Sequence, residues 1–177
     1  MKVLGLCFLI YDIINHEDLW HNWLRNVDVS KYRIYIHYKY DTKLAYFDKY
    51  KLDVCVDTKY ADISIVKAQN ALLKASIKDN CTHQILLSNS CVPLKSFSHV
   101  YANIREGFSY FNLLSDSLYR HTKIIGSTEM NLSSIHKSSQ WCILSTRHSK
   151  YILRDVLIYH ELSKCYAPDE LVYLTIL

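Results

Sequence analysis

One carboxylate near the end of the chain is the strongest candidate for acid–base chemistry. Glu170 closes the segment Tyr-Ala-Pro-Asp-Glu, in which Pro168 predicts the first turn of a helix. A carboxylate at such a position can take the proton of a hydroxyl group while that oxygen attacks an electrophilic carbon. Alternatively, Asp169 and Glu170 only balance the positive end of the helix dipole. The local sequence leaves both interpretations open.

A polar segment that follows an apolar run is the second candidate. Residues 85–87 are Ile-Leu-Leu, a continuous run that predicts a strand covered on both faces. Residues 88–91 supply small polar groups and a thiol, and Pro93 cannot donate a strand hydrogen bond. Ligands of open α/β sheets bind outside the carboxyl ends of the strands, so we expect a ligand near Ser88. A purely structural strand-to-helix turn is the alternative.

Several common chemistries have no motif in this sequence. The three glycines, Gly5, Gly107 and Gly126, are too scattered to form a Gly-rich phosphate loop. There is no G-x-S-x-G, no H-E-x-x-H and no D-x-D, so neither a serine nucleophile nor a divalent metal site is expected. The six cysteines are widely spaced and form no C-x-x-C, which favours reduced thiols.

Strands and helices that would position these residues alternate along the chain. Apolar runs and alternation predict strands over residues 2–11, 32–40, 54–56, 85–87, 108–114 and 141–145, with one more over 124–125. Periodicity and capping residues predict helices that start at Asn15, Asp62, His99, at His148 or Ser149, and at Pro168. The strand over 32–40 alternates, which predicts a half-buried strand with Tyr35 and His37 on one face. This order of elements predicts a three-layer α/β domain.

Size and charge limit the class of protein. The 177 residues fit one domain, 1–177, with a sizeable core. Lys and Arg number 21 against 17 Asp and Glu, and the net charge of +4 is below that typical of nucleic-acid-binding domains. Basic and aromatic residues between Lys31 and Lys43 still leave a Tyr-rich nucleic-acid-binding module as an alternative. No signal peptide or anchor is recognised, so we expect a soluble, cytoplasmic chain, such as that of a virus or bacterium.

Six segments in sequence order resemble the core-2/I-branching enzyme family of glycosyltransferases, which is related to the xylosyltransferases. They are Leu9-Ile10-Tyr11; Ile34-Tyr35-Ile36-His37; Tyr60-Ala61 with Ile65-Val66-Lys67-Ala68; Ile85-Leu86-Leu87-Ser88 with Pro93-Leu94-Lys95-Ser96; Ser139-Gln140-Trp141 with Leu144-Ser145-Thr146-Arg147; and Ala167-Pro168-Asp169-Glu170 with Thr175. The resemblance covers nearly the whole chain, and it favours Glu170 as a catalytic base.

The resemblance implies a GT-A-like three-layer sandwich with a mixed, mainly parallel sheet flanked by helices. It also implies an inverting, metal-independent enzyme without a cofactor, which moves GlcNAc or xylose from a UDP-sugar to a hydroxyl of a glycan or glycoprotein. Glu170 would be the base. The residues implied at the nucleotide are Leu9, Ile10, Tyr11, Lys39, Tyr40, Asp41, Tyr60 and Ser88. Lys39 stands where the family usually has Asp.

The resemblance ends at Leu177, before the basic residues that offset the diphosphate charge in the family. Fixed cations matter because stabilisation of developing charge commonly supplies a large share of catalysis. Lys67, Lys95, Lys123 or Arg147 would then have to supply that charge. A truncated relative that binds a nucleotide-sugar or a glycan without turnover is therefore an alternative function.

Overall fold

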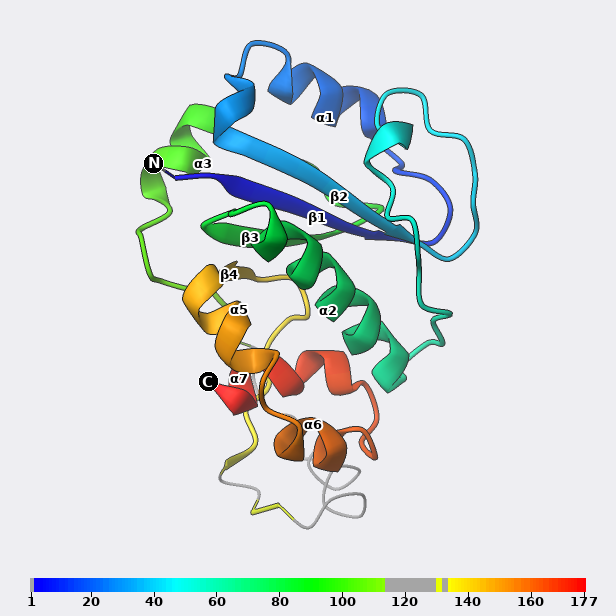
Figure 1. Ribbon diagram of the computed structural model, residues 1–177, viewed down its shortest axis with the longest axis vertical. Helices are drawn as coiled ribbons and strands as arrows, with labels where there is room; N and C mark the ends of the chain where they lie inside the picture. Colours follow the sequence, from blue (N-terminus) through cyan, green and yellow to red (C-terminus); the bar gives the residue numbers. More distant parts are fainter. Residues whose placement is uncertain (1, 114–129, 132–133) are drawn as a thin grey trace.

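A mixed sheet with helices on both faces forms the fold in the computed structural model, which describes residues 2–113, 130–131 and 134–177 (Figure 1). The strands are β1 (Leu4–Ile10), β2 (Tyr32–Tyr38), β3 (His83–Ser88) and β4 (Ile143–Ser145). The α-helices are α1 (Glu17–Leu24), α2 (Ile63–Lys78), α3 (Phe97–Asn103), α5 (Thr146–Ile152), α6 (Leu157–Leu162) and α7 (Val172–Ile176). Short 3-10 helices are η1 (Val29–Lys31), η2 (Asp48–Tyr50) and η4 (Pro168–Glu170).

The strand order is β2-β1-β3-β4. Strand β1 pairs in parallel with β2 and β3, whereas β4 pairs antiparallel to β3. The register aligns Ile10 with Tyr38 and Leu9 with Ser88, so three strands end at the same edge of the sheet. The prediction of an α/β, GT-A-like sandwich with a mixed, mainly parallel sheet is therefore confirmed.

Each face of the sheet carries its own apolar core. Leu4, Leu6 and Phe8 of β1 pack on one face, in a cluster that also contains residues of α1 and α3. Cys7 points to the other face, where α2 and the C-terminal helices pack. Figure 1 shows these two helical layers on opposite sides of the strands. A strand covered on both faces needs no polar alternation, and this explains the continuous apolar run of β1.

Three strand predictions need correction. Tyr35 and His37 are only 6% and 0% exposed because α2 packs on their face of β2, so β2 is buried and not half-buried. Residues 54–56 form no strand, and Val54 is 80% exposed. In the described part of 108–114, pairing is limited to isolated bridges. The strand predicted over 124–125 lies outside the described residues.

Capping predictions had mixed outcomes. The carboxylate of Asp62 accepts a hydrogen bond of 2.8 Å from Ser64 N and caps α2 as predicted. Asn15 does not cap α1; its backbone N–H donates to Asn89 O instead, across 2.9 Å. The helix predicted from His148 or Ser149 is two helices, α5 and α6. No helix in the described part of the chain has the length and apolar character needed to cross a membrane.

Candidate functional site

A pocket of about 390 Å³ opens where β1, β2 and β3 end. Its walls come from the ends of β1 and β3, from the segment before α2, and from the residues before β4. The lining residues are Leu9, Ile10, Tyr11, Lys39, Thr58, Lys59, Tyr60, Ile65, Ser88, Asn89, Gln140 and Trp141. The structure thus brings together six of the residues proposed for the nucleotide: Leu9, Ile10, Tyr11, Lys39, Tyr60 and Ser88.

The segment 56–60, whose last three residues line the pocket, is attached to the end of β2. His37 Nε2 accepts a hydrogen bond of 2.8 Å from Val56 N, and Lys39 Nζ donates across 2.8 Å to Thr58 O. Burial lowers the pKa of His37 to about 4, so the imidazole is neutral at pH 7 and can accept this bond. A buried side chain of β2 therefore positions a pocket wall nineteen residues further along the chain.

An aromatic pair stands at the rim of the pocket. The rings of Tyr11 and Tyr40 meet edge to face, with centroids 4.9 Å apart. The ammonium of Lys39 lies over both rings, 5.5 and 5.8 Å from their centroids. A hydrogen bond with Tyr40 raises the pKa of Tyr11, so the phenol stays protonated at neutral pH. Tyr40 does not line the pocket but supports Tyr11, which does.

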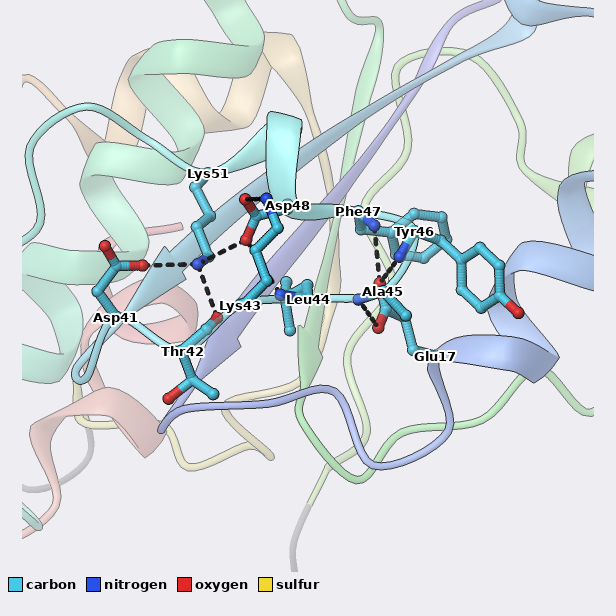
Figure 2. A network of polar contacts seen from close by, with 10 residues as sticks. All are labelled: Glu17, Asp41, Thr42, Lys43, Leu44, Ala45, Tyr46, Phe47, Asp48 and Lys51. Atoms are coloured by element: carbon cyan, nitrogen blue, oxygen red, sulfur yellow. Dashed lines mark hydrogen bonds and ion pairs between the residues drawn. The ribbon is translucent and has the colours of Figure 1, made fainter.

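Asp41 does not line the pocket and belongs to a network that fixes the loop after β2 (Figure 2). Lys51 Nζ binds Asp41 at 2.6 Å and Asp48 at 2.8 Å. At the other end of the loop, Glu17 accepts backbone N–H groups from residues 45–47 across 2.7 to 2.9 Å. These contacts give Asp41 a structural role in the loop.

Glu170 lies beside the pocket and not among its lining residues. Its carboxylate is 2.9 Å from Lys137 Nζ, and the two side chains are 28% and 7% exposed. A hydrogen bond with Tyr166 is the main cause that raises the pKa of Tyr60, and the charges of Asp169 and Glu170 add to it. The backbone connects this segment to the pocket rim, because Ala167 N donates across 3.2 Å to the carbonyl of Ala61, the residue after Tyr60.

From the sequence there was no reason to propose Asp169 as a catalytic or binding residue. It is 7% exposed, and its Oδ1 has no hydrogen-bond partner among the described residues. Burial raises its pKa to about 6, with a further contribution from the charge of Glu170. Only the adjacent acidic pair signalled it in the sequence.

The six remaining lining residues were not proposed for the nucleotide, because loops supply most of them. They are Thr58, Lys59, Ile65, Asn89, Gln140 and Trp141. Of these six, Asn89 belongs to the polar segment 88–91 near which a ligand was expected. Gln140 and Trp141 stand in a segment that carried the family resemblance, whereas nothing distinguished Lys59 in the sequence.

The pocket has different cations from those expected. Lys67, Lys95 and Arg147 do not line it, and Lys123 lies outside the described residues. Lys39 and Lys59 are the cationic side chains on its wall. Among the residues that the structure describes, no three His, Cys, Asp or Glu side chains gather in a way that could hold a metal ion.

Comparison with known proteins gives the class of this domain. The model of the family described as "Branch: Core-2/I-Branching enzyme" matches residues 6–177, so the chain belongs to the core-2/I-branching enzyme family. The chain is also similar to a protein named glycosyltransferase BC10 from Oryza sativa subsp. japonica, with 21% identity over 170 residues. That match covers 91% of this chain and 43% of the rice protein, so the chain spans less than half of its curated relative.

Proposed function

We propose that this chain transfers a sugar, GlcNAc or xylose, from a UDP-sugar to a hydroxyl of a glycan or glycoprotein. The observation that carries the proposal is that backbone hydrogen bonds join the segment of Glu170 to the pocket wall: Ala167 N donates to Ala61 O across 3.2 Å, next to Tyr60, and Ser138 N donates to Glu170 O across 2.9 Å, two residues before Gln140. Membership of the core-2/I-branching family supports a glycosyltransferase, as does the name of the rice relative.

In the proposed mechanism, the donor occupies the pocket with its diphosphate near Lys39 and Lys59. These ammonium groups offset the negative charge that grows on UDP as the bond between the anomeric carbon and the phosphate oxygen breaks. The acceptor oxygen attacks the anomeric carbon from the opposite side, so the configuration inverts. Glu170 takes the proton that the hydroxyl loses, and Lys137 holds the carboxylate in place through their ion pair. No metal is required in this scheme.

A chain that binds the donor without turnover is the second candidate. The ion pair with the nearly buried Lys137 favours it, because this contact already engages one carboxylate oxygen of Glu170. For the nucleic-acid-binding alternative, Tyr35 and His37 of β2 are buried beneath α2 and are not available to stack on bases.

A thermal-shift panel of UDP-sugars, with and without EDTA, tests donor binding. A donor at 100 times its Kd adds about 2.7 kcal/mol of stability, and we expect the shift to survive EDTA. Loss of the shift in EDTA would contradict metal independence. If no UDP-sugar stabilises the chain, the proposed donor class is wrong.

Transfer and donor hydrolysis are then followed as UDP release. Glu170→Gln is expected to lower turnover by about 10²- to 10⁴-fold while it keeps the donor-induced shift. Glu106→Gln is the matched control, because Glu106 is exposed and does not line the pocket. Donor binding with background turnover in both the wild type and Glu170→Gln would identify the non-catalytic alternative.

A further inference from the structure

A second pocket, of about 420 Å³, lies at the opposite end of the parallel strands. It is lined by Asn22, Trp23, Asn26, Val27, Asp28, Lys31, Phe97, Ser98 and Tyr101. Asp28 and Lys31 precede β2, whereas Lys39 of the first pocket follows it. Figure 1 shows α3 beside the start of β1 and the N-terminus. Six residue steps of about 3.3 Å along β2 separate the two pockets by roughly 20 Å.

Fixed aromatic rings form the apolar wall of this second pocket. Phe97 packs between Trp23 and Tyr101, with ring centroids 5.2 and 5.6 Å away. The indole N–H of Trp23 donates to Lys95 O, and the hydroxyl of Tyr101 donates to Lys2 O, both across 2.7 Å. Because the carbonyls of Lys95 and Lys2 hold the polar ends of Trp23 and Tyr101, these two rings lose little freedom when a ligand binds. The ammonium groups of Lys2 and Lys31 lie 4.5 and 5.6 Å from the centroid of the Tyr101 ring.

Two side-chain amides, of Asn22 and Asn26, line the pocket together with these rings. Asn22 and Asn26 are exposed and four positions apart, and neither side chain makes a hydrogen bond to another described residue. Asp28 uses one carboxylate oxygen to accept from Ser30 N at 2.9 Å. Each amide offers both donors and an acceptor, which is the combination that hydroxyl groups need. Among the described residues that line this pocket, Lys31 carries the one positive charge and Asp28 the one negative charge, so this lining has no net charge that would favour a phosphate.

We propose that this second pocket binds a neutral saccharide. A sugar ring presents C–H groups on one face, which pack on aromatic rings, and hydroxyl groups at its edge, which pair with the amides of Asn22 and Asn26. The site shares no residue with the pocket at the carboxyl ends of the strands. It therefore goes beyond the proposed transfer reaction and would hold a glycan independently of the donor.

Saturation-transfer NMR without any nucleotide tests the proposal, with neutral oligomers of GlcNAc, galactose and xylose as probes and UDP as a separate arm. The double variant Asn22→Ala with Asn26→Ala is expected to weaken binding of the recognised oligomer by at least tenfold. Asn112→Ala is the matched control, because Asn112 is exposed and lies outside both pockets. Circular dichroism confirms that each variant is folded.

The outcomes separate this proposal from the proposed enzyme activity. Saccharide binding that falls in the double variant and persists in Tyr11→Ala, a change in the first pocket, supports it. Binding that falls only in Tyr11→Ala overturns it, as does the absence of binding by every neutral oligomer. Neither result depends on a UDP-sugar shift, so failure of the donor experiment leaves this test intact.

Discussion

Replacement of Asp169 by Asn should stabilise the chain, and more so at alkaline pH. Burial raises the pKa of this carboxyl from 3.8 to about 6, so the folded state disfavours the charged form. A raised carboxyl pKa means that stability is highest below pH 3.8 and falls as the pH rises through 6. The penalty amounts to about 1 kcal/mol at pH 4.5 and about 3 kcal/mol at pH 8. Asn carries no charge, so its advantage over Asp should grow by about 2 kcal/mol between these pH values.

Urea unfolding of the wild type and Asp169→Asn at pH 4.5 and pH 8 measures this difference directly. Asp57→Asn is the control for the substitution itself, because Asp57 is exposed and its replacement should change the free energy of unfolding by less than about 0.5 kcal/mol. A loss of stability in Asp169→Asn that is equal at pH 4.5 and pH 8 would refute the reasoning. It would mean that the buried carboxylate is satisfied by contacts that the amide cannot reproduce.

Three further substitutions test the scaffold. Asp62→Ala should lower the free energy of unfolding by about 1 kcal/mol in urea at pH 7. Because contacts with Ser64 lower the pKa of Asp62, this difference in stability should vanish as the pH falls through that lowered pKa. A difference that stays constant with pH would contradict the capping role. Leu72→Ala, at a fully buried position of α2, should cost about 2–5 kcal/mol in the same assay, and a cost below 1 kcal/mol would contradict its place in the core. Glu17→Ala leaves the N–H groups of residues 45–47 without their acceptor, so limited proteolysis should cleave that loop faster than in Glu106→Ala; equal rates would contradict the clamp.

The sequence predicted best those elements whose conformation and burial can be recognised from their own residues, without knowledge of which elements pack against them. Strand β1 consists almost entirely of apolar residues and β3 has an apolar run at its centre, residues 85–87, so a buried position inside a sheet suits both. Helix α2 has both a cap and a stripe, which are local signals. Strand β2 was misjudged because its alternation of Ile with Tyr and His suggests one wet face. Helix α2, which begins 25 residues after β2 ends, covers that face.

The candidate site follows the same division. Leu9, Tyr11 and Ser88 were predictable, since strand ends in a parallel sheet meet at one edge. Asp41 was not, because its partner Lys51 depends on how a loop folds back (Figure 2). The buried environment of Asp169 was equally hidden, since it depends on packing between η4 and α2.

Buried polar atoms without hydrogen-bond partners support the pocket at the carboxyl ends of the strands as the functional site. This argument is independent of the comparison with other proteins. Among the described residues, His37 Nδ1, Gln69 Oε1, Gln140 Oε1 and Asp169 Oδ1 are buried without a hydrogen-bond partner. Each such atom costs about 1–3 kcal/mol, and apolar residues would avoid the cost. His37 holds the pocket wall, Gln140 lines the pocket, Gln69 donates to Gln140 O, and Asp169 precedes Glu170. This cost is tolerated where function requires polar groups, and three of the four residues, His37, Gln69 and Gln140, hold, contact or line the pocket at the strand ends.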